Sequence, residues 1–174
     1  MSYSMSKQDL FVMHMHRDKI KQFTYLEIGA SHPMDINNTY LLELNGWQGN
    51  SVDIDGSNEQ LWNQVRKNPL LIMDALKINH IDTDRIDYLS LDIEPPEQTM
   101  QCWINLASTR CRFSIVTFEH DAYNGSDIRQ ISRGVFESLG YMLAVPDVMS
   151  PFGPYEDWYI DTQSDINLEL LKSW

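Results

Sequence analysis

Short, continuous runs of apolar residues alternate along the chain with stretches that have helical spacing. Continuous apolar runs are typical of strands that are covered on both faces of a parallel sheet. Five strands of this kind are expected at residues 24–28, 50–54, 70–74, 86–92 and 113–119, and two more at 141–145 and 158–161. The pattern of alternating strands and helices predicts an α/β fold with a mostly parallel sheet.

Helical spacing occupies the segments between these runs. Helices are expected at residues 38–44, 57–66, 97–107 and 127–139. Gly46 and Gly140 follow the first and the last of them, where glycine commonly ends a helix. A helix over residues 7–23 is expected before the first strand, and a short amphipathic helix over 164–174 at the end. We therefore expect one domain over residues 1–174, with 1–23 as an N-terminal helical extension.

Composition narrows the classes of protein that fit. The chain has 174 residues, 43% of them hydrophobic, and no apolar run approaches the roughly 20 residues that a membrane helix needs. Its start lacks a basic region followed by an apolar stretch, so we expect a cytoplasmic protein. Cys102 and Cys111 fit no metal-binding or redox spacing and are expected to be reduced thiols. The formal net charge of −12 repels phosphate backbones, so a small-molecule or glycan acceptor fits better than a nucleic acid.

The first strand ends in Glu27, Ile28, Gly29 and Ala30, where the chain passes into a helix. This places a glycine and free backbone amides at the carboxyl edge of the sheet, which is where cofactors bind in such folds. Glycine lets the backbone approach a ligand closely, and the short side chains of Ala30 and Ser31 keep the space open. Ordinary turn chemistry explains the same residues, so the motif needs support from elsewhere in the chain.

Support comes from the ends of the next two strands. Asp53 and Asp55 follow the second strand, and an acidic side chain at this place accepts hydrogen bonds from both ribose hydroxyls in dinucleotide-binding folds. We favour Asp53, because Asp55 with Ser57 also fits a helix cap. Asp74 follows the third strand, where it either accepts the amine of an adenine or simply begins a turn.

The loop after Gly29 separates two kinds of cofactor. A phosphate-binding G-x-G-x-x-G motif is absent, Pro33 removes a backbone donor, and Asp35 repels phosphate. A cofactor without phosphates is therefore favoured over NAD, and S-adenosylmethionine meets this requirement.

With these residues in place, the sequence resembles the FkbM-type methyltransferases, a branch of the S-adenosylmethionine-dependent superfamily. Three stretches carry the resemblance, at residues 25–55, 86–97 and 118–141. It implies a Rossmann-like seven-stranded sheet that is mostly parallel, with its last strand antiparallel and helices on both faces. The chain departs from the family pattern at His32-Pro33 in the opening loop and at Pro95-Pro96, where glycine is common.

The resemblance also implies a set of cofactor-binding residues. Residues at the ends of the first four strands and at the start of the first helix would surround S-adenosylmethionine. Glu27, Gly29 and Ala30 would line the methionine end with Ser31, Asn38 and Thr39 beside them, Asp53 and Ile54 would meet the ribose, Asp74 and Ala75 the adenine, and Asp92 and Glu94 would face the transferred methyl group.

Methyl transfer to a hydroxyl requires alignment of the acceptor and a group that takes its proton. Four strand-end side chains are the candidate catalytic residues: Asp92, Glu94, Glu119 and His120. His120 is either a general base or metal ligand, or a satisfied polar residue that ends a strand. The same four side chains are a possible site for a divalent cation, although nothing in the sequence requires one.

The sequence thus predicts an S-adenosylmethionine-dependent methyltransferase that modifies a hydroxyl of a small molecule or a sugar. Two other classes stay open. A non-catalytic binding module with the same fold is one, because Pro95-Pro96 alters the loop at the reaction centre. A NAD-dependent oxidoreductase or epimerase is the other, although the glycine motif is missing.

Overall fold

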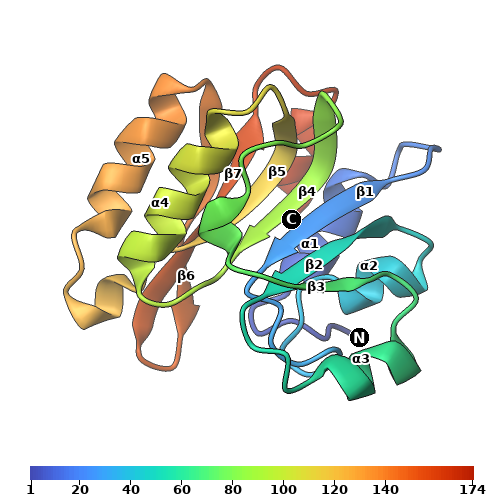
Figure 1. The fold of residues 1–174 in the computed structure, drawn as a ribbon. Coiled ribbons are helices and arrows are strands. Elements are labelled where there is room, and N and C mark those ends of the chain that lie inside the picture. The colour runs from blue at the N-terminus through green and yellow to red at the C-terminus, as the bar shows by residue number, and fades with distance from the viewer.

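The computed structural model describes residues 1–174, and its seven strands form a single sheet in the order β3-β2-β1-β4-β5-β7-β6 (Figure 1). The strands are β1 (Thr24–Ile28), β2 (Gln48–Asp53), β3 (Leu70–Ile72), β4 (Arg85–Leu91), β5 (Arg112–Glu119), β6 (Tyr141–Ser150) and β7 (Gly153–Asp161). Strands β1 to β5 pair in parallel, and β7 runs antiparallel to both β5 and β6. The predicted seven-stranded sheet with an antiparallel last strand is confirmed.

Helices cover both faces of the sheet, as predicted. On one face lie α1 (Gln8–Met15), α2 (Tyr40–Leu44) and α3 (Glu59–Val65), and on the other α4 (Pro96–Ala107) and α5 (Ile128–Ser138) (Figure 1). Three short 3₁₀ helices complete the structure: η1 (Ala75–Lys77), η2 (Ala122–Asn124) and η3 (Leu168–Ser173). Pro96 occupies the first position of α4, where a proline is well tolerated because no helical N–H bond is lost.

The two faces of the sheet hold separate cores, because successive strand residues point to opposite sides. Leu26 and Ile28 of β1 belong to the core that contains Trp103 and Phe136 of α4 and α5. Tyr25 belongs to the other core, together with residues of α1, α2, β4 and β7. The same alternation decides which residues at the strand ends reach a common site.

Several expected element boundaries differ from the structure. The N-terminal helix ends at Met15 instead of continuing to residue 23, and the tail folds as a 3₁₀ helix. Strands β6 and β7 are longer than expected and form a hairpin. β6 continues through Pro146, where its pairing with β7 is irregular. The sequence predicted an end at Val145 because proline usually interrupts a strand. At a bulge, however, proline is compatible with a strand.

The third strand is also shorter and less buried than expected. β3 covers three residues at the edge of the sheet, and Leu71 and Ile72 are 39% and 45% exposed. The chain returns from β3 to β4 through η1 rather than through an α-helix.

Candidate functional site

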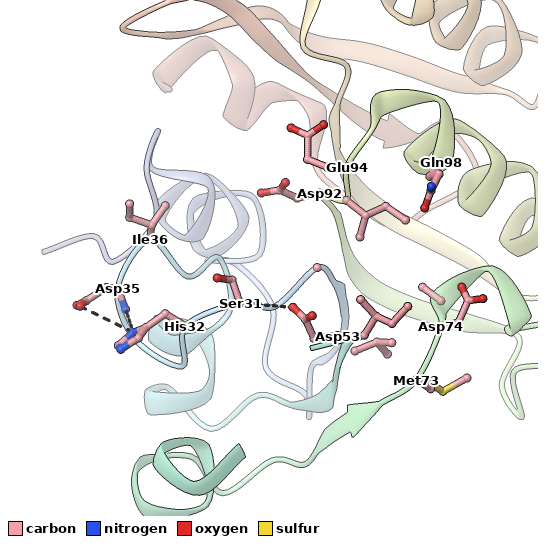
Figure 2. Close-up of a pocket in the computed structure, with 15 residues that line it drawn as sticks. Ser31, His32, Asp35, Ile36, Asp53, Met73, Asp74, Asp92, Glu94 and Gln98 are labelled. Carbon is pink, nitrogen blue, oxygen red and sulfur yellow. Dashed lines mark hydrogen bonds and ion pairs between the residues drawn. The ribbon is translucent and has the colours of Figure 1, made fainter. Parts of the chain in front are cut away.

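A cavity of about 700 Å³ opens at the carboxyl ends of β1, β2 and β4 (Figure 2). In the sheet, β2 and β3 lie on one side of β1, and β4 and β5 lie on the other, so the strand order reverses beside β1. Open α/β sheets bind ligands at such a reversal, and the cavity lies there. Its lining includes Asp35, Asp53, Asp74, Asp92 and Glu94 and contains no lysine or arginine. An anionic ligand such as a pyrophosphate would meet five carboxylates there, with His32 as the one basic side chain.

Gly29 lies in the lining and cannot carry a side chain. Its φ angle is +82°, and a Cβ atom at this position would lie 1.6 Å from the backbone oxygen of Asp92. The Gly29 N–H donates to the carbonyl of Val52 at 2.9 Å. The end of β1 is therefore packed so tightly against its neighbours that only glycine fits at position 29.

Asp53 connects two loops at the edge of the cavity. Its Oδ2 accepts the N–H of Ser31 at 2.7 Å, and its Oδ1 accepts the N–H of Asp55 at 2.8 Å. Each carboxylate oxygen keeps a second lone pair for a ligand. Asp55 lies outside the lining and instead binds the backbone and hydroxyl of Ser57 at 2.8 and 2.9 Å. Of the two carboxylates, only Asp53 lines the cavity, next to the exposed side chain of Ile54.

Asp74 combines the two roles that the sequence left open. It lines the cavity together with Met73 and Ala75, and its Oδ1 also accepts the N–H of Leu76 at 2.9 Å at the start of η1. Figure 2 shows Asp74 and Ser31 on opposite sides of Asp53, with Asp92 and Glu94 at another wall. The ends of β1, β2, β3 and β4 thus contribute side chains to one cavity.

Four of the predicted cofactor-binding residues lie behind the cavity rather than in its lining. They are Glu27, Ala30, Asn38 and Thr39. Glu27 is 2% exposed, and its Oε2 accepts hydrogen bonds from Thr39 at 2.8 Å and from Ser51 at 2.7 Å. Burial raises the pKa of Glu27, and the charge of Arg66 opposes this shift. These residues support the loop after β1 from the α2 side of the sheet.

The buried residue Arg66 organises this support and was not predicted. Its guanidinium donates to Glu43 at 2.6 Å, to the carbonyl of Pro33 at 3.0 Å, and to Tyr25 and Thr39 at 2.9 Å each. It also stacks over the Trp62 ring at 4.4 Å. Arg66 therefore fixes the His32-Pro33 loop to β1 and α2. An arginine near a helix end gives no sequence signal for such a role.

A second group of carboxyls lies at the wall of the cavity formed by β4 and β5. Asp92 and Glu94 line the cavity, Glu119 lies within hydrogen-bonding reach of Asp92, and Asp121 stands in the same relation to Glu94. Loss of solvation and the neighbouring carboxyls raise the pKa of Glu94 to about 7, and the same two causes raise that of Glu119 further. The structure therefore brings together three of the four predicted catalytic residues.

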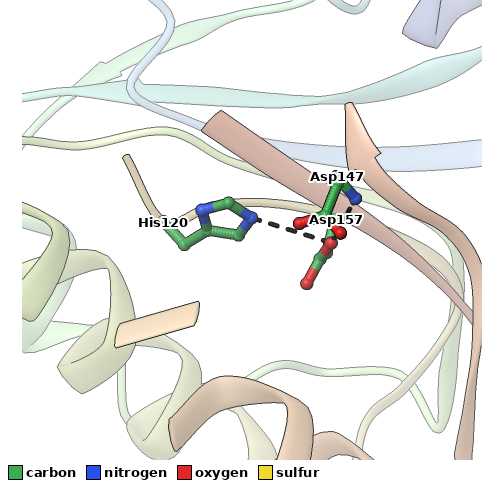
Figure 3. Close-up of side chains that lie close together, drawn as sticks. All are labelled: His120, Asp147 and Asp157. Atoms are coloured by element: carbon green, nitrogen blue, oxygen red, sulfur yellow. Dashed lines mark hydrogen bonds and ion pairs between the residues drawn. The ribbon is translucent and has the colours of Figure 1, made fainter. Parts of the chain in front are cut away.

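His120 is the exception, because its side chain faces Asp157 and Asp147 instead of these carboxyls (Figure 3). Its ring is fully buried, its Nδ1 accepts the N–H of Ala122 at 3.2 Å, and its Nε2 lies 3.6 Å from Oδ1 of Asp157. Neighbouring residues of a strand end point in opposite directions, so Glu119 and His120 do not reach one site. The four-residue cation site suggested by the sequence does not assemble.

His120 instead forms a compact group with Asp147 and Asp157, whose ligand atoms lie within 4.8 Å of one another. Arg133 already donates to both oxygens of Asp157 and to Asp147, each at 2.8 Å. Arg129 donates to Asp147 at 2.9 Å. The two guanidinium groups neutralise both carboxylates, so these residues fit an internal ion-pair network better than a metal ion.

Several solved structures with a similar architecture are methyltransferases. Magnesium protoporphyrin IX methyltransferase from Synechocystis PCC 6803, solved with bound S-adenosylmethionine, is 17% identical with a TM-score of 0.59, over 87% of this chain and 76% of that one. An rRNA methylase from Streptococcus thermophilus is 11% identical with a TM-score of 0.58, over 92% and 100% of the two chains. A 1,6-didemethyltoxoflavin-N1-methyltransferase from Burkholderia thailandensis, with its substrate and S-adenosylhomocysteine bound, is 9% identical with a TM-score of 0.54, over 88% and 76%.

These likenesses show that the chain has the Rossmann-like fold of the S-adenosylmethionine-dependent methyltransferases. No family model and no curated protein matches the sequence, so membership of the FkbM branch stays a prediction. No helix in the structure is both long enough and apolar enough to cross a membrane.

Proposed function

We propose that this protein is an S-adenosylmethionine-dependent methyltransferase that modifies a hydroxyl group of a small molecule or a glycan. One observation carries the proposal: the cavity at the carboxyl edge of the sheet is lined by five carboxylates and several apolar side chains, with His32 as its one basic residue and no lysine or arginine. S-adenosylmethionine has a positively charged sulfonium and no phosphate, so its charge suits this lining.

The lining residues match the parts of the cofactor. Asp53 would accept the ribose hydroxyls with its free lone pairs, and Asp74 would accept the exocyclic amine of the adenine. Ile54, Met73 and Ile93 give the cavity apolar walls suited to a flat base. Gly29 and Ser31 would face the methionine end, while Glu27, Ala30, Asn38 and Thr39 hold the loop from behind.

When bound, the cofactor supplies a methyl group that is activated by the positive sulfur. The protein must then align an acceptor oxygen and take its proton. Asp92 and Glu94 line the cavity, and a carboxyl with a pKa of about 7, as Glu94 has, is well matched to accept a proton near neutral pH. We therefore assign the role of general base to Glu94, with Asp92 and Glu119 beside it.

Each of the two alternative functions predicts a different binding result. A non-catalytic module would bind the cofactor without turnover. A NAD-dependent oxidoreductase or epimerase would bind NAD, for which the cavity offers no lysine or arginine to hold the phosphates. The net charge of −12 also disfavours a nucleic-acid acceptor.

Isothermal titration calorimetry with S-adenosylhomocysteine tests the proposal. We expect binding for this ligand and none for NAD. Asp53→Ala is expected to weaken binding more than tenfold, or about 1.4 kcal/mol, because both ribose contacts are lost. Asp55→Ala is the matched control, since that carboxylate lies outside the cavity lining, and it is expected to bind normally. Absence of heat with S-adenosylhomocysteine, or heat with NAD instead, would contradict the proposed function.

A further inference from the structure

Ile36 lies in the loop after β1 in a backbone conformation that isoleucine rarely adopts. Its φ angle is +52°, in the left-handed region where a side chain branched at Cβ is strained. At its other positive φ angles the chain has glycine, aspartate, serine or lysine. Ile36 is the one such residue that is branched at Cβ, and local stability alone would favour glycine or asparagine there.

Burial does not compensate for the strain at Ile36. The residue is 66% exposed, so its side chain gains little from the hydrophobic effect. It also belongs to the lining of the cavity at the carboxyl edge of the sheet. Strained residues gather at ligand sites, where the strain holds a side chain in place for the ligand. An exposed and strained apolar residue in a cavity lining therefore indicates a contact with a ligand.

The residues on both sides of Ile36 are fixed by hydrogen bonds. The N–H of Asp35 donates to Nδ1 of His32 at 2.9 Å. Asn37 is 1% exposed, its N–H donates to the carbonyl of Tyr3 at 3.2 Å, and its side-chain amide donates to the carbonyl of His32 at 3.1 Å. These bonds hold the backbone of Ile36 in the strained conformation.

The position of Ile36 in the cavity indicates which part of the reaction it meets. Figure 2 shows Ile36 and Asp74, the residue proposed to bind the adenine, on opposite sides of the cavity. The loop that carries Ile36 begins at Gly29, which packs against the backbone of Asp92 at the end of β4. With the adenine at Asp74, the reacting end of the cofactor and the acceptor would lie between Ile36 and the wall that carries Glu94.

We propose that Ile36 forms an apolar wall of the acceptor site and selects a hydroxyl that is carried on an apolar carbon skeleton, such as a phenol or a cyclic alcohol. This rests on the proposed function, and it narrows the acceptor to an apolar small molecule instead of a glycan. Contact with Ile36 removes apolar surface of both partners from water, which stabilises the complex. A sugar ring would instead lose hydrogen bonds to water at this wall.

Cyclohexanol and myo-inositol test the proposal, because they share a six-membered carbon ring and differ in the polarity of its substituents. Their dissociation constants are measured by NMR titration of the protein saturated with S-adenosylhomocysteine. We expect cyclohexanol to bind at least about tenfold more tightly than myo-inositol. Ile36→Asn suits the left-handed conformation but is polar, so it should reduce this preference below about threefold. Ile36→Val stays apolar and branched at Cβ, so it should keep most of the preference.

Thermal unfolding of Ile36→Gly tests the strain separately. Removal of the branched side chain should raise the melting temperature by about 2–4 °C and also weaken the preference for cyclohexanol. Lys7→Gly is the matched control, because Lys7 also has a positive φ of +69° but lies outside the cavity lining. It should leave the preference for cyclohexanol unchanged. A lower melting temperature for Ile36→Gly would contradict the account of strain.

The outcomes separate this inference from the proposed function. Equal binding of the two alcohols, no binding of cyclohexanol, or a preference that survives Ile36→Asn would overturn the inference. Weaker binding of S-adenosylhomocysteine to Ile36→Asn, with the preference for cyclohexanol kept, would overturn it by placing Ile36 against the cofactor. Failure of S-adenosylhomocysteine to bind the unchanged protein contradicts the proposed function instead, and the titration of the two alcohols is then carried out on the protein alone.

Discussion

Replacing Arg66 with methionine tests how the loop after β1, which contains Pro33, is held. The change keeps an apolar stem over Trp62 but removes the donors to Glu43, Tyr25 and Thr39. It leaves the buried carboxyls of Glu27 and Glu43 without a cation. Removing one partner of a buried ion pair costs about 3–5 kcal/mol.

We therefore expect Arg66→Met to lower the free energy of unfolding by about 4 kcal/mol. For a chain of this size each kcal/mol shifts the melting temperature by roughly 2–4 °C, so a decrease of about 8–16 °C follows. Urea denaturation followed by tryptophan fluorescence measures the first quantity and calorimetry the second. Lys67→Met is the matched control, because that neighbouring side chain is exposed and should change stability little.

The pH dependence gives a sharper test of the same reasoning. Burial already raises the pKa of Glu27, and loss of the Arg66 charge raises it further. A raised folded-state pKa means that the folded protein binds the proton more tightly, so the stability from this group is lost as the pH increases. Arg66→Met should therefore be more damaging at pH 8 than at pH 5, and adding Glu27→Gln should restore part of the loss. A loss below 1 kcal/mol, or one independent of pH, would refute this account of Arg66.

Two further changes have expected outcomes of their own. Gly29→Ala should lower the free energy of unfolding by about 3 kcal/mol or more, because a Cβ would lie 1.6 Å from the Asp92 oxygen at a φ of +82°. Gly134→Ala in helix α5, where a Cβ would have nothing within 4 Å, should raise it by about 0.5–1 kcal/mol in the same urea titration. Equal effects of the two changes would contradict the argument. Burial raises the pKa of Glu156 from 4.5 to about 8, so its contribution to stability is fully present below about pH 4.5 and is lost as the pH rises through 8. Glu156→Gln should therefore stabilise the protein by about 2 kcal/mol at pH 8 and little at pH 4.5, and a gain of equal size at both values would rule out titration of this carboxyl as the cause.

The sequence predicts the sheet well because its strands carry local signals. The apolar runs identify all seven strands, and residues at the ends of the first four, such as Gly29, Asp53 and Asp74, line the cavity. These residues follow parallel strands directly, so the topology alone brings them to one edge. Boundaries are less predictable, since β6 continues through Pro146 by irregular pairing that depends on β7.

The parts that could not be predicted depend on contacts between distant segments. Arg66 meets Pro33 and Tyr25, which are far from it in the sequence, and no local pattern reports such contacts. Likewise, Phe152 reaches Tyr123 only because the hairpin is longer than its apolar run. Glu119 and His120 were predicted to share one site, but a difference of one position along the chain sends their side chains to opposite faces.

That division at the end of β5 also explains how one short segment serves both structure and site. His120 faces Asp157, which Arg133 neutralises, so this face holds an ion pair that stabilises the fold. Glu119 and Asp121 face carboxyls that have no such partner, and their crowding raises the pKa of Glu119 and Glu94. Raised pKa values of carboxyls mean that their charged forms cost folding free energy at neutral pH. On the opposite face arginines remove this cost by pairing with the carboxylates, whereas at the cavity wall it is lowered because the carboxyls hold their protons to a higher pH.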